Sequence, residues 1–457
     1  MHFVHPPRQK SDTIAACATA PGVGAISVIR ISGKRAFDIA EIIFSGPVKS
    51  YQTHTAHYGQ IKDADGHPID SVLLLVMKGP RSYTGEDSVE ISCHGGNLIT
   101  RRVLERIFEA GARPAEPGEF SSRAYLNGKL DLAQAEAVQQ LIASKSEIAL
   151  QNAEKQLSGR LSKTIAAFQR ELTKITAILE AWVDFPEEGL EFASFDALIT
   201  QLREMASQIE RLAATFHEGK MLNTGVSLCL LGAPNVGKSS LMNALLGKER
   251  AIVTDIAGTT RDLLEEDLQL SGLHFRLIDT AGIRETEEII EQEGIRRSKV
   301  AMQEADLILL VLDASRALNA QDKALLDTVP PEKTVLVWNK IDEAIPSESI
   351  EWKAKAHISA KERIGLDELR AAIDKILWQK GAPSREEMTI TTLRHRNALL
   401  SAQESIEAVI KGLSSRISAE FVASDMRNAL NELGTIIGTN VTEDILTSIF
   451  SQFCLGK

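Results

Sequence analysis

A short glycine-rich segment carries the clearest chemistry in the sequence. Residues 232–239 read Gly-Ala-Pro-Asn-Val-Gly-Lys-Ser, which fits the pattern G-x4-G-K-S, and the apolar run 226–231 precedes them. Such a loop lets backbone N–H groups surround a phosphate at a helix N-terminus, with Lys238 reaching the β- and γ-phosphate oxygens and Ser239 able to ligate Mg²⁺. Because a helical run at 241–246 follows, the match predicts a phosphate-binding loop rather than a chance coincidence.

Three further motifs follow in the order that guanine-nucleotide hydrolysis requires. Residues 279–282 (Asp-Thr-Ala-Gly) end an apolar run at 275–278 and predict a carboxylate near Mg²⁺ and a glycine N–H near the γ-phosphate. Residues 339–342 read Asn-Lys-Ile-Asp, and Asp342 can accept from guanine N1–H and the 2-amino group, which adenine does not offer. Charge-assisted bonds of this kind are worth about 1.5–3 kcal/mol each, enough to select GTP over ATP. Residues 359–361 (Ser-Ala-Lys) supply a loop behind the base.

The group that orients the attacking water is less clear from the motifs. Ras-like proteins place a glutamine after the D-x-x-G glycine, but Ile283 stands here, so another group must act or hydrolysis is very slow. The loop 254–260 offers Thr260 for Mg²⁺ and several carbonyls, and Asn235 could complete a monovalent-cation site that stabilises transition-state charge as an arginine finger does. The acidic run 285–293 could hold the water-orienting group, but a solvated segment explains it equally well.

The residues expected to bind GTP are Asn235, Val236, Gly237, Lys238, Ser239, Ser240, Thr254, Asp255, Ile256, Ala257, Gly258, Thr259, Thr260, Asp279, Thr280, Ala281, Gly282, Asn339, Lys340, Asp342, Ser359, Ala360 and Lys361.

The first of three zones that must position these motifs is an α+β segment. Residues 26–32 and 88–94 alternate apolar and polar side chains, and each run ends at glycine, which is typical of half-buried strands. The pattern turns helical over 98–110. We therefore expect an N-terminal α+β domain over 1–125.

Helices flank the region of the nucleotide motifs on both sides. No proline occurs from 132 to 182, and apolar residues from Leu157 onward recur at steps of three or four, which predicts one long striped helix ending at the turn 184–186. A further helix is expected at about 195–218. Helical periodicity returns after residue 385, and because a striped helix needs a partner, we expect the segments 126–222 and 384–457 to form one bundle.

Between these halves the pattern changes to alternating strands and helices. Short apolar runs at 226–231, 275–278, 307–312 and 335–338 are each followed by a polar loop. Such runs suit a parallel sheet that helices bury on both faces. The predicted fold is thus multidomain α+β: an N-terminal α+β domain, a discontinuous α-helical bundle, and an inserted Ras-like α/β P-loop GTPase domain over 223–383.

Composition limits the alternatives. The 457 residues carry 51 Lys and Arg against 62 Asp and Glu, a net charge of −11, which argues against a protein that coats RNA with its whole surface. The four cysteines are far apart and form no CxxC pair, which excludes a disulfide scaffold and the usual zinc modules. No apolar run approaches the ~18 residues of a membrane span, and the N-terminus lacks an apolar signal core. We expect a cytoplasmic protein without a membrane span.

From end to end the sequence resembles the MnmE (TrmE) family of tRNA modification GTPases. The GTPase motifs alone would fit several translation-associated GTPases, but their insertion between helical halves is more specific. The matching segments are 12–16 (Asp-Thr-Ile-Ala-Ala), 21–24 (Pro-Gly-Val-Gly), 30–33 (Arg-Ile-Ser-Gly), 83–87 (Tyr-Thr-Gly-Glu-Asp), 94–96 (His-Gly-Gly), 117–120 (Pro-Gly-Glu-Phe), 127–132 (Asn-Gly-Lys-Leu-Asp-Leu), 258–262 (Gly-Thr-Thr-Arg-Asp) and 454–457 (Cys-Leu-Gly-Lys).

For the nucleotide site, the resemblance implies a K⁺-stimulated GTPase whose G domains dimerise during turnover. Glu291 matches the family's water-orienting glutamate, so the resemblance favours a catalytic role for it over a solvated acidic segment. Lys238 and Asn235 are implied to be the other catalytic groups. The metal ligands implied are Ser239 and Thr260 for Mg²⁺, and Asn235, Thr254, Ile256 and Thr259 for K⁺.

For the N-terminal domain, the resemblance implies constitutive dimerisation and a folate-binding-type fold that holds a tetrahydrofolate derivative (5,10-methylene- or 5-formyl-tetrahydrofolate). The residues implied are Arg30, Glu90, Lys129 and Lys457. The chemistry is reasonable, since folate carboxylates favour Arg and Lys and the pterin N–H groups favour a carboxylate. From the strand pattern alone each would more often be a solvated surface charge. Cys454 is implied to be functional, without a specified role.

The function implied is GTP hydrolysis coupled to tRNA modification. With the FAD-containing partner MnmG (GidA), in a heterotetramer or larger complex around a homodimer, the family installs a carboxymethylaminomethyl or aminomethyl group at C5 of the wobble uridine of certain tRNAs. GTP hydrolysis then acts as a conformational switch. Two alternatives stay open at this point: a regulatory RNA- or ribosome-assembly GTPase without one-carbon chemistry, and a folate-binding scaffold whose G domain merely dimerises.

Overall fold

The computed structural model describes residues 12–184, 194–246, 267–270, 272–278, 302–378, 389–415, 419–454 and 456–457. The chain divides into two compact units. The first comprises Met1–Gln139, Gln156–Glu188 and Met426–Lys457, and the second comprises Gln140–Lys155 and Gly189–Asp425. Each unit is therefore assembled from segments that are far apart in the sequence.

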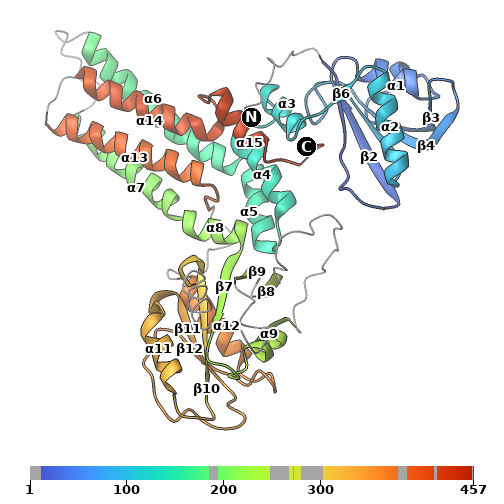
Figure 1. Ribbon diagram of the computed structural model, residues 1–457. Coiled ribbons are helices and arrows are strands. Elements are labelled where there is room, and N and C mark those ends of the chain that lie inside the picture. Colours follow the sequence, from blue (N-terminus) through green and yellow to red (C-terminus); the bar gives the residue numbers. More distant parts are fainter. Residues whose placement is uncertain are drawn as a thin grey trace. The chain divides into compact units, whose positions relative to one another are not determined.

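A mixed β-sheet forms the N-terminal part of the first unit (Figure 1). Its described strands follow the order β3-β4-β5-β2-β1-β6, and α1 and α2 pack against the core on one face. Alternation along β2 and β5 buries Ile29 and Ile91 in that core and leaves Arg30 and Glu90 on the opposite face. The bounds are β1 (Ile14–Cys17), β2 (Ile26–Ser32), α1 (Ala36–Ile43), η1 (Val48–Ser50), β3 (Thr55–Lys62), β4 (Pro68–Met77), β5 (Ser88–His94), α2 (Asn97–Glu109) and β6 (Arg113–Pro114).

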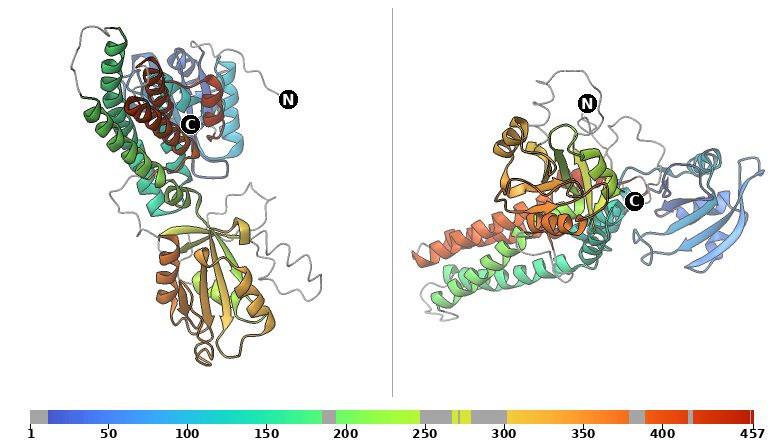
Figure 2. Two further views of the ribbon diagram at one scale, coloured as in Figure 1. Left: turned by 90° about the vertical axis from the view of Figure 1, so that its left-hand side faces the viewer. Right: turned by 90° about the horizontal axis from the view of Figure 1, so that it is seen from below.

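Helices complete the first unit. Gln169 on α6 donates to the Leu430 carbonyl of α14 at 3.3 Å, so a segment near residue 170 pairs with the C-terminal region, as the apolar stripes predicted. Figures 1 and 2 show α6 and α14 side by side in every view. Phe450 and Phe453 pack with Leu132 of α4 in a small separate core. The bounds are α3 (Glu119–Leu126), α4 (Leu132–Ala143), α6 (Arg160–Asp184), α14 (Ala419–Ile437) and α15 (Glu443–Phe450).

The single long helix expected from 132 to 182 is wrong. The segment forms three helices, and the helical backbone is interrupted between α5 (Glu147–Leu157) and α6 although the apolar stripe continues. The interruption falls at Gly159, whose φ of +77° is left-handed and unsuited to a helix interior. The helix expected at 195–218 is likewise divided, into α7 (Phe195–Ala214) and α8 (Phe216–Thr224).

The second unit pairs α7 with α13 (Leu393–Ser414) along their apolar faces, and the two helices lie side by side in Figure 1 and Figure 2. Leu202 and Ile209 of α7 and Leu399 and Ile406 of α13 are buried. This pairing confirms that the last part of the chain packs against the helices before residue 220. No helix among the described residues is both long and apolar enough to cross a lipid bilayer.

An α/β domain fills the rest of the second unit. Its described strands follow the order β12-β11-β10-β7-β9-β8, in which only the β8–β9 pair is antiparallel. Core residues of α9 and α12 cover one face and those of α11 cover the other, so β7 and β10 are buried along their whole length, as predicted. The bounds are β7 (Val226–Leu231), α9 (Lys238–Leu246), β8 (Asp267–Leu270), β9 (Leu273–Ile278), β10 (Leu307–Asp313), α11 (Ala320–Thr328), η3 (Pro331–Lys333), β11 (Thr334–Asn339), β12 (Lys355–His357) and α12 (Leu366–Leu377).

Candidate functional site

The glycine-rich segment forms a loop between β7 and the N-terminus of α9. The Lys238 ammonium donates to the carbonyl oxygens of Gly232 and Ala233, both at 2.9 Å, so the chain folds back over this lysine. Asn235 is exposed and has a left-handed φ of +62°, while Val236 beside it is buried in the core. Lys238 therefore lies within the concave loop, at the helix end where an anion binds.

The loop after β11 contacts both the phosphate loop and the 359–361 segment. The Asn339 side-chain amide donates to the Val236 carbonyl at 2.8 Å, and its oxygen accepts from the Ala360 backbone N–H at 3.0 Å. Asn339 is buried, so these bonds satisfy polar groups that water does not reach. One side chain thus holds together three loops that the sequence assigned to one site.

Asp342 is the acceptor expected to recognise guanine, and it is exposed at this edge. A side-chain hydrogen bond from Ser359 is the largest influence on its pKa and lowers it below the ordinary value. The carboxylate is therefore ionised at neutral pH and free of a proton that would block acceptance. Ser359 itself is buried and fixed by the bridge between Ser359 and Ile364.

The other predicted nucleotide-site residues divide into two groups. Ser239, Ser240 and Lys361 are exposed and lie next to the groups just described. The described ones also include the half-buried Gly237 and Lys340. The others lie outside the described residues: Thr254, Asp255, Ile256, Ala257, Gly258, Thr259, Thr260, Asp279, Thr280, Ala281, Gly282 and Glu291, and so does Ile283.

A second cluster gathers around Arg30 in the first unit. Arg30 and Glu90 are direct partners across β2 and β5, and Nε and Nη2 of Arg30 both lie 2.8 Å from Glu90 Oε1. The guanidinium lies 5.2 Å from the centroid of the Tyr83 ring and 5.6 Å from that of Phe120, within the range of cation–π attraction. The half-buried cation is therefore held in one position by a carboxylate and two aromatic faces.

The C-terminal tail completes this cluster. Arg30 Nη1 donates to the Gly456 carbonyl at 3.2 Å, and the Lys457 ammonium lies 5.6 Å from the Tyr83 ring centroid. Burial, and then the charge of Arg30, lower the pKa of Lys457, while Glu90 opposes the shift. Gly456 has a φ of +88°, and a Cβ there would lie 2.5 Å from the Cys17 carbonyl oxygen, so the tail needs glycine at this point.

One of the predicted residues lies elsewhere. The Lys129 ammonium donates to the Pro80 carbonyl at 3.0 Å, which fastens the loop that leads to Tyr83, and no described contact joins it to Arg30 or Glu90. Cys454 is exposed and belongs to the tail, where its carbonyl oxygen accepts from the Lys457 backbone N–H at 3.3 Å. The structure thus brings together Arg30, Glu90 and Lys457, with Cys454 beside Lys457.

A buried ion network supports the loop and the helix that carry the two aromatic rings. Glu119, 2% exposed, accepts from Arg113 at 2.8 Å and from Arg123 at 3.0 Å. Arg123 also contacts Glu86 at 3.2 Å and Asp12 at 2.7 Å. Burial raises the pKa of Glu119, but hydrogen bonds from Arg113 and its other donors outweigh burial and lower it to about 2. The network ties α3 to β1, β6 and the loop before β5.

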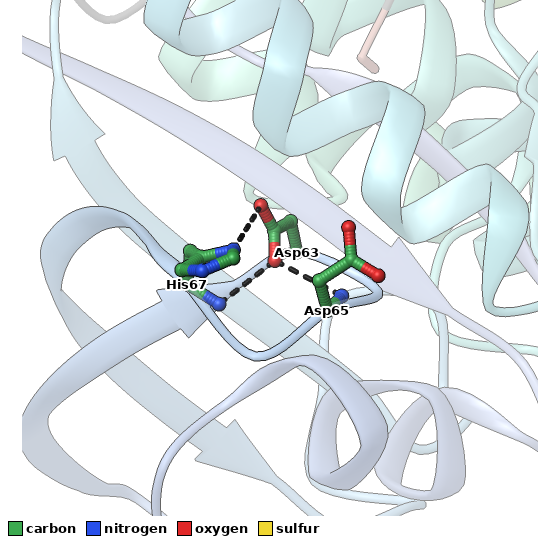
Figure 3. Close-up of side chains that lie close together, drawn as sticks. All are labelled: Asp63, Asp65 and His67. Carbon is green, nitrogen blue, oxygen red and sulfur yellow. Dashed lines mark hydrogen bonds and ion pairs between the residues drawn. The ribbon is translucent and has the colours of Figure 1, made fainter.

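A group of three ionisable side chains in the β3–β4 turn is explained by the turn itself (Figure 3). Asp63 Oδ1 accepts from the backbone N–H groups of Asp65 at 3.1 Å and His67 at 2.8 Å. The hydrogen bond from His67 is the main cause of the lowered pKa of Asp63. Asp63 acts as the cap of a hairpin turn, a common role for aspartate.

The sequence reasoning missed Tyr83 and Phe120 as parts of the Arg30 cluster. Both residues lie in segments that carried the family resemblance, 83–87 and 117–120. No spacing rule could have placed their rings near Arg30, because the three residues come from separate elements. The composition of those segments was the available signal.

A phosphate loop, an N-K-x-D loop and an S-A-K loop at one edge of a parallel α/β sheet define a P-loop protein that binds guanine nucleotides. Residues 13–129 match the family description "GTP-binding protein TrmE N-terminus", and residues 132–454 match "MnmE helical domain". The chain belongs to the tRNA modification GTPase MnmE family, a family of GTP-hydrolysing enzymes.

Relatives cover the full length of the chain. The tRNA modification GTPase MnmE of Protochlamydia amoebophila (strain UWE25) is 59% identical over 460 residues, covering 100% of both chains. That of Geobacter sulfurreducens (strain ATCC 51573 / DSM 12127 / PCA) is 43% identical, covering 98% of this chain and 99% of its own. The G domain of the T. maritima FeoB iron transporter aligns with 33% of this chain and 98% of its own at 29% identity and a TM-score of 0.24. The family assignment depends on the family models and the sequence relatives.

Proposed function

We propose that this protein hydrolyses GTP and, with the FAD-containing partner MnmG (GidA), installs a carboxymethylaminomethyl or aminomethyl group at C5 of the wobble uridine of certain tRNAs. A tetrahydrofolate derivative supplies the one-carbon unit. Family membership supports the pairing of these activities. The observation that carries the proposal is the Arg30–Glu90 pair enclosed by Tyr83, Phe120 and the C-terminal tail, because a GTPase that only switches has no use for such a cluster.

In the nucleotide site, Asp342 accepts from guanine and Lys238 balances the charge of the β- and γ-phosphates. The lowered pKa of Asp342 and the position of the Lys238 ammonium within its loop support these roles. Ser239 and Thr260 hold Mg²⁺. Glu291 orients the attacking water, since Ile283 cannot.

A potassium ion held by Asn235, Thr254, Ile256 and Thr259 is the second proposed metal. The exposed Asn235, within the phosphate loop, is suited to ligate a cation through its side-chain oxygen. When bound, K⁺ supplies positive charge where negative charge develops during hydrolysis.

The residues present in the Arg30 cluster fit a folate. The flat faces of Tyr83 and Phe120 suit stacking on a pterin or benzoyl ring, and Arg30 and Lys457 suit its carboxylates. Glu90 offers an acceptor for pterin N–H groups. Lys129 contributes by holding the loop of Tyr83 through Pro80, and the exposed Cys454 lies three residues before the end of the tail.

We also propose a homodimer formed through the N-terminal domain. Tyr58 and Leu73 are direct cross-strand partners on β3 and β4, and they are 77% and 51% exposed. Two large apolar side chains side by side on an open sheet face are typical of a surface that another chain covers. tRNA and MnmG complete the proposed assembly.

The test is a reconstituted modification reaction. The purified chain, MnmG, unmodified tRNA, GTP, K⁺, ammonium or glycine and methylene-tetrahydrofolate are combined, and the digested tRNA is analysed by mass spectrometry. We expect a modified wobble uridine from the wild type. Arg30→Ala should lose this product and retain GTP hydrolysis, because Arg30 belongs to the first unit and the nucleotide loops belong to the second.

The matched control is Arg101→Ala, since Arg101 is an exposed arginine on α2 paired only with its neighbour Glu105 among the contacts described. It should modify tRNA as the wild type does. Normal modification by Arg30→Ala would remove the folate role of the cluster. GTP hydrolysis without any wobble product from the wild type would favour a regulatory GTPase.

A further inference from the structure

An ion pair links the ends of two adjacent strands at the nucleotide edge of the second unit. The Lys340 ammonium donates to Asp313 Oδ2 at 2.7 Å. Asp313 is the last residue of β10, and it lies opposite Asn339 in the parallel register of β10 and β11. Lys340, which follows Asn339, therefore reaches sideways from the end of one strand to the end of the next.

Asp313 is held so that it can serve as an anchor. It is 6% exposed, and its other oxygen, Oδ1, accepts from the backbone N–H of Ser315 at 2.9 Å and from the Ser315 hydroxyl at 2.6 Å. Burial raises the pKa of Asp313, but the hydrogen bonds from Lys340 and Ser315 outweigh burial and lower it. The carboxylate is charged and has little freedom to rotate.

The nearby arginine does not compete for this role. Arg316 donates to Asp322 at 2.7 Å, and its Nε lies 3.9 Å from Asp313. The Asp322 side chain also accepts from the backbone N–H of Asn319, in the capping box at the start of α11. Lys340 is therefore the closest cation of Asp313 among the contacts that the structure describes.

The direction of the Lys340 side chain follows from the strand order. Strands β11, β10 and β7 are parallel neighbours, so their carboxyl ends lie in a row. The phosphate loop follows β7, and Asp342 follows β11. A nucleotide with its base at Asp342 and its phosphates at Lys238 must extend along this row, past the end of β10. The stem of Lys340 runs along the same row, because its ammonium is fixed at Asp313.

From this placement we infer that Asp313 is a positioning residue for the guanine nucleotide. It holds the Lys340 ammonium at the end of β10, and the extended aliphatic stem provides an apolar platform for the purine ring. The backbone of Lys340 has a left-handed φ of +67°, which orients the side chain away from the strand direction. The inference depends on the nucleotide site proposed above and adds to it the residue that shapes the base platform.

The test measures binding of fluorescently labelled GDP with Mg²⁺ to the full-length chain. Asp313→Asn keeps the size of the side chain but removes the charge that attracts the ammonium, so we expect the Kd to rise at least tenfold, the lower end of the value of one charge-assisted hydrogen bond. Asp322→Asn is the matched control, a buried aspartate in the first turn of α11 that bonds Arg316 and has no described contact with Lys340. It should leave the Kd within twofold of the wild type while lowering thermal stability.

A double-mutant cycle separates positioning from general damage. Lys340→Met keeps an apolar stem without an ammonium, and in that background Asp313→Asn should not change the Kd further. Wild-type affinity in Asp313→Asn, an equal loss in both backgrounds, or an equal loss in Asp322→Asn would each overturn the inference. Failure of the wild type to bind GDP would instead overturn the proposed nucleotide site.

Discussion

The side-chain amide of Asn339 donates a 2.8 Å hydrogen bond to the carbonyl oxygen of Val236, which lies in the phosphate loop. The side-chain oxygen of Asn339 accepts from the backbone N–H of Ala360 at 3.0 Å. The N-K-x-D loop, the phosphate loop and the 359–361 segment are thus joined by one buried side chain. Nucleotide affinity should depend on this residue even if it touches no ligand atom.

Asn339→Ala should weaken GTP binding and destabilise the α/β domain. The change leaves two buried backbone groups without their partner, at a cost of about 1–3 kcal/mol each. We expect at least a tenfold higher Kd and a lower unfolding temperature. Asn319→Ala is the control, since Asn319 caps α11. It should lower stability with an unchanged Kd, and wild-type affinity in Asn339→Ala would contradict the role of the bridge.

GTP hydrolysis should be faster in K⁺ than in Na⁺ at equal ionic strength, because Ile283 leaves the site without a water-orienting glutamine. Equal rates in the two salts would remove the potassium site and with it the catalytic role of Asn235.

Glu291→Ala should lose hydrolysis and keep GTP affinity, which is the signature of an interaction made only in the transition state. Glu293→Ala changes a neighbouring acidic residue and serves as the control.

Gly456→Ala should displace the C-terminal tail. The new Cβ would lie 2.5 Å from the Cys17 carbonyl oxygen, so the contact between Arg30 and the tail must break. We expect folate affinity to fall about tenfold or more, measured by calorimetry, and amide hydrogen exchange in β1 to increase. Gly66→Ala is a close control, because Gly66 has the same φ of +88° with nothing within 4 Å of the added atom. Unchanged folate affinity in Gly456→Ala would separate the tail from the site.

Glu119→Gln should destabilise the N-terminal domain in a pH-dependent way. The folded-state pKa of Glu119 is lowered to about 2 from 4.5, so its stabilisation is complete above pH 4.5 and is lost as the pH falls through 2. At neutral pH we expect a loss on the order of 3 kcal/mol from this shift.

Scanning calorimetry of the full-length chain between pH 3 and 7 measures this difference. The gap in unfolding temperature between wild type and Glu119→Gln should narrow toward acid pH. Glu105→Gln, on the exposed face of α2, should show little change at any pH. A gap that widened toward acid pH would contradict the sign of the shift.

The sequence predicted the strands and the order of the loops well, because local patterns determine them. The runs 26–32, 88–94 and 226–231 carry a strand period or an unbroken apolar core, and the structure places strands there with the same bounds. The same reasoning missed the break at Gly159, since the apolar stripe continued beyond it. A glycine can adopt a left-handed φ, but the residue type alone does not require it, so the sequence did not indicate a helix end there.

The contacts within the sites were harder to predict. Lys129 holds a loop instead of joining Arg30, and Tyr83 and Phe120 enclose Arg30 although they lie on other elements. Each of these relationships depends on how α3 and the loop before β5 pack against the sheet. The spacing of residues along the chain does not predict this packing, whereas the family resemblance identified the segments that contain Tyr83 and Phe120.

In the proposed function, modification depends on recognition of guanine by Asp342. The most direct test changes the hydrogen-bonding groups of the base and of this side chain. Calorimetry with Mg²⁺ and K⁺ compares GTP with xanthosine triphosphate, whose base presents an acceptor in place of the 2-amino donor. The wild type should bind GTP and not the xanthine nucleotide, and Asp342→Asn should reverse this preference. Equal binding of both nucleotides by the wild type, or an unchanged preference in the variant, would contradict the account.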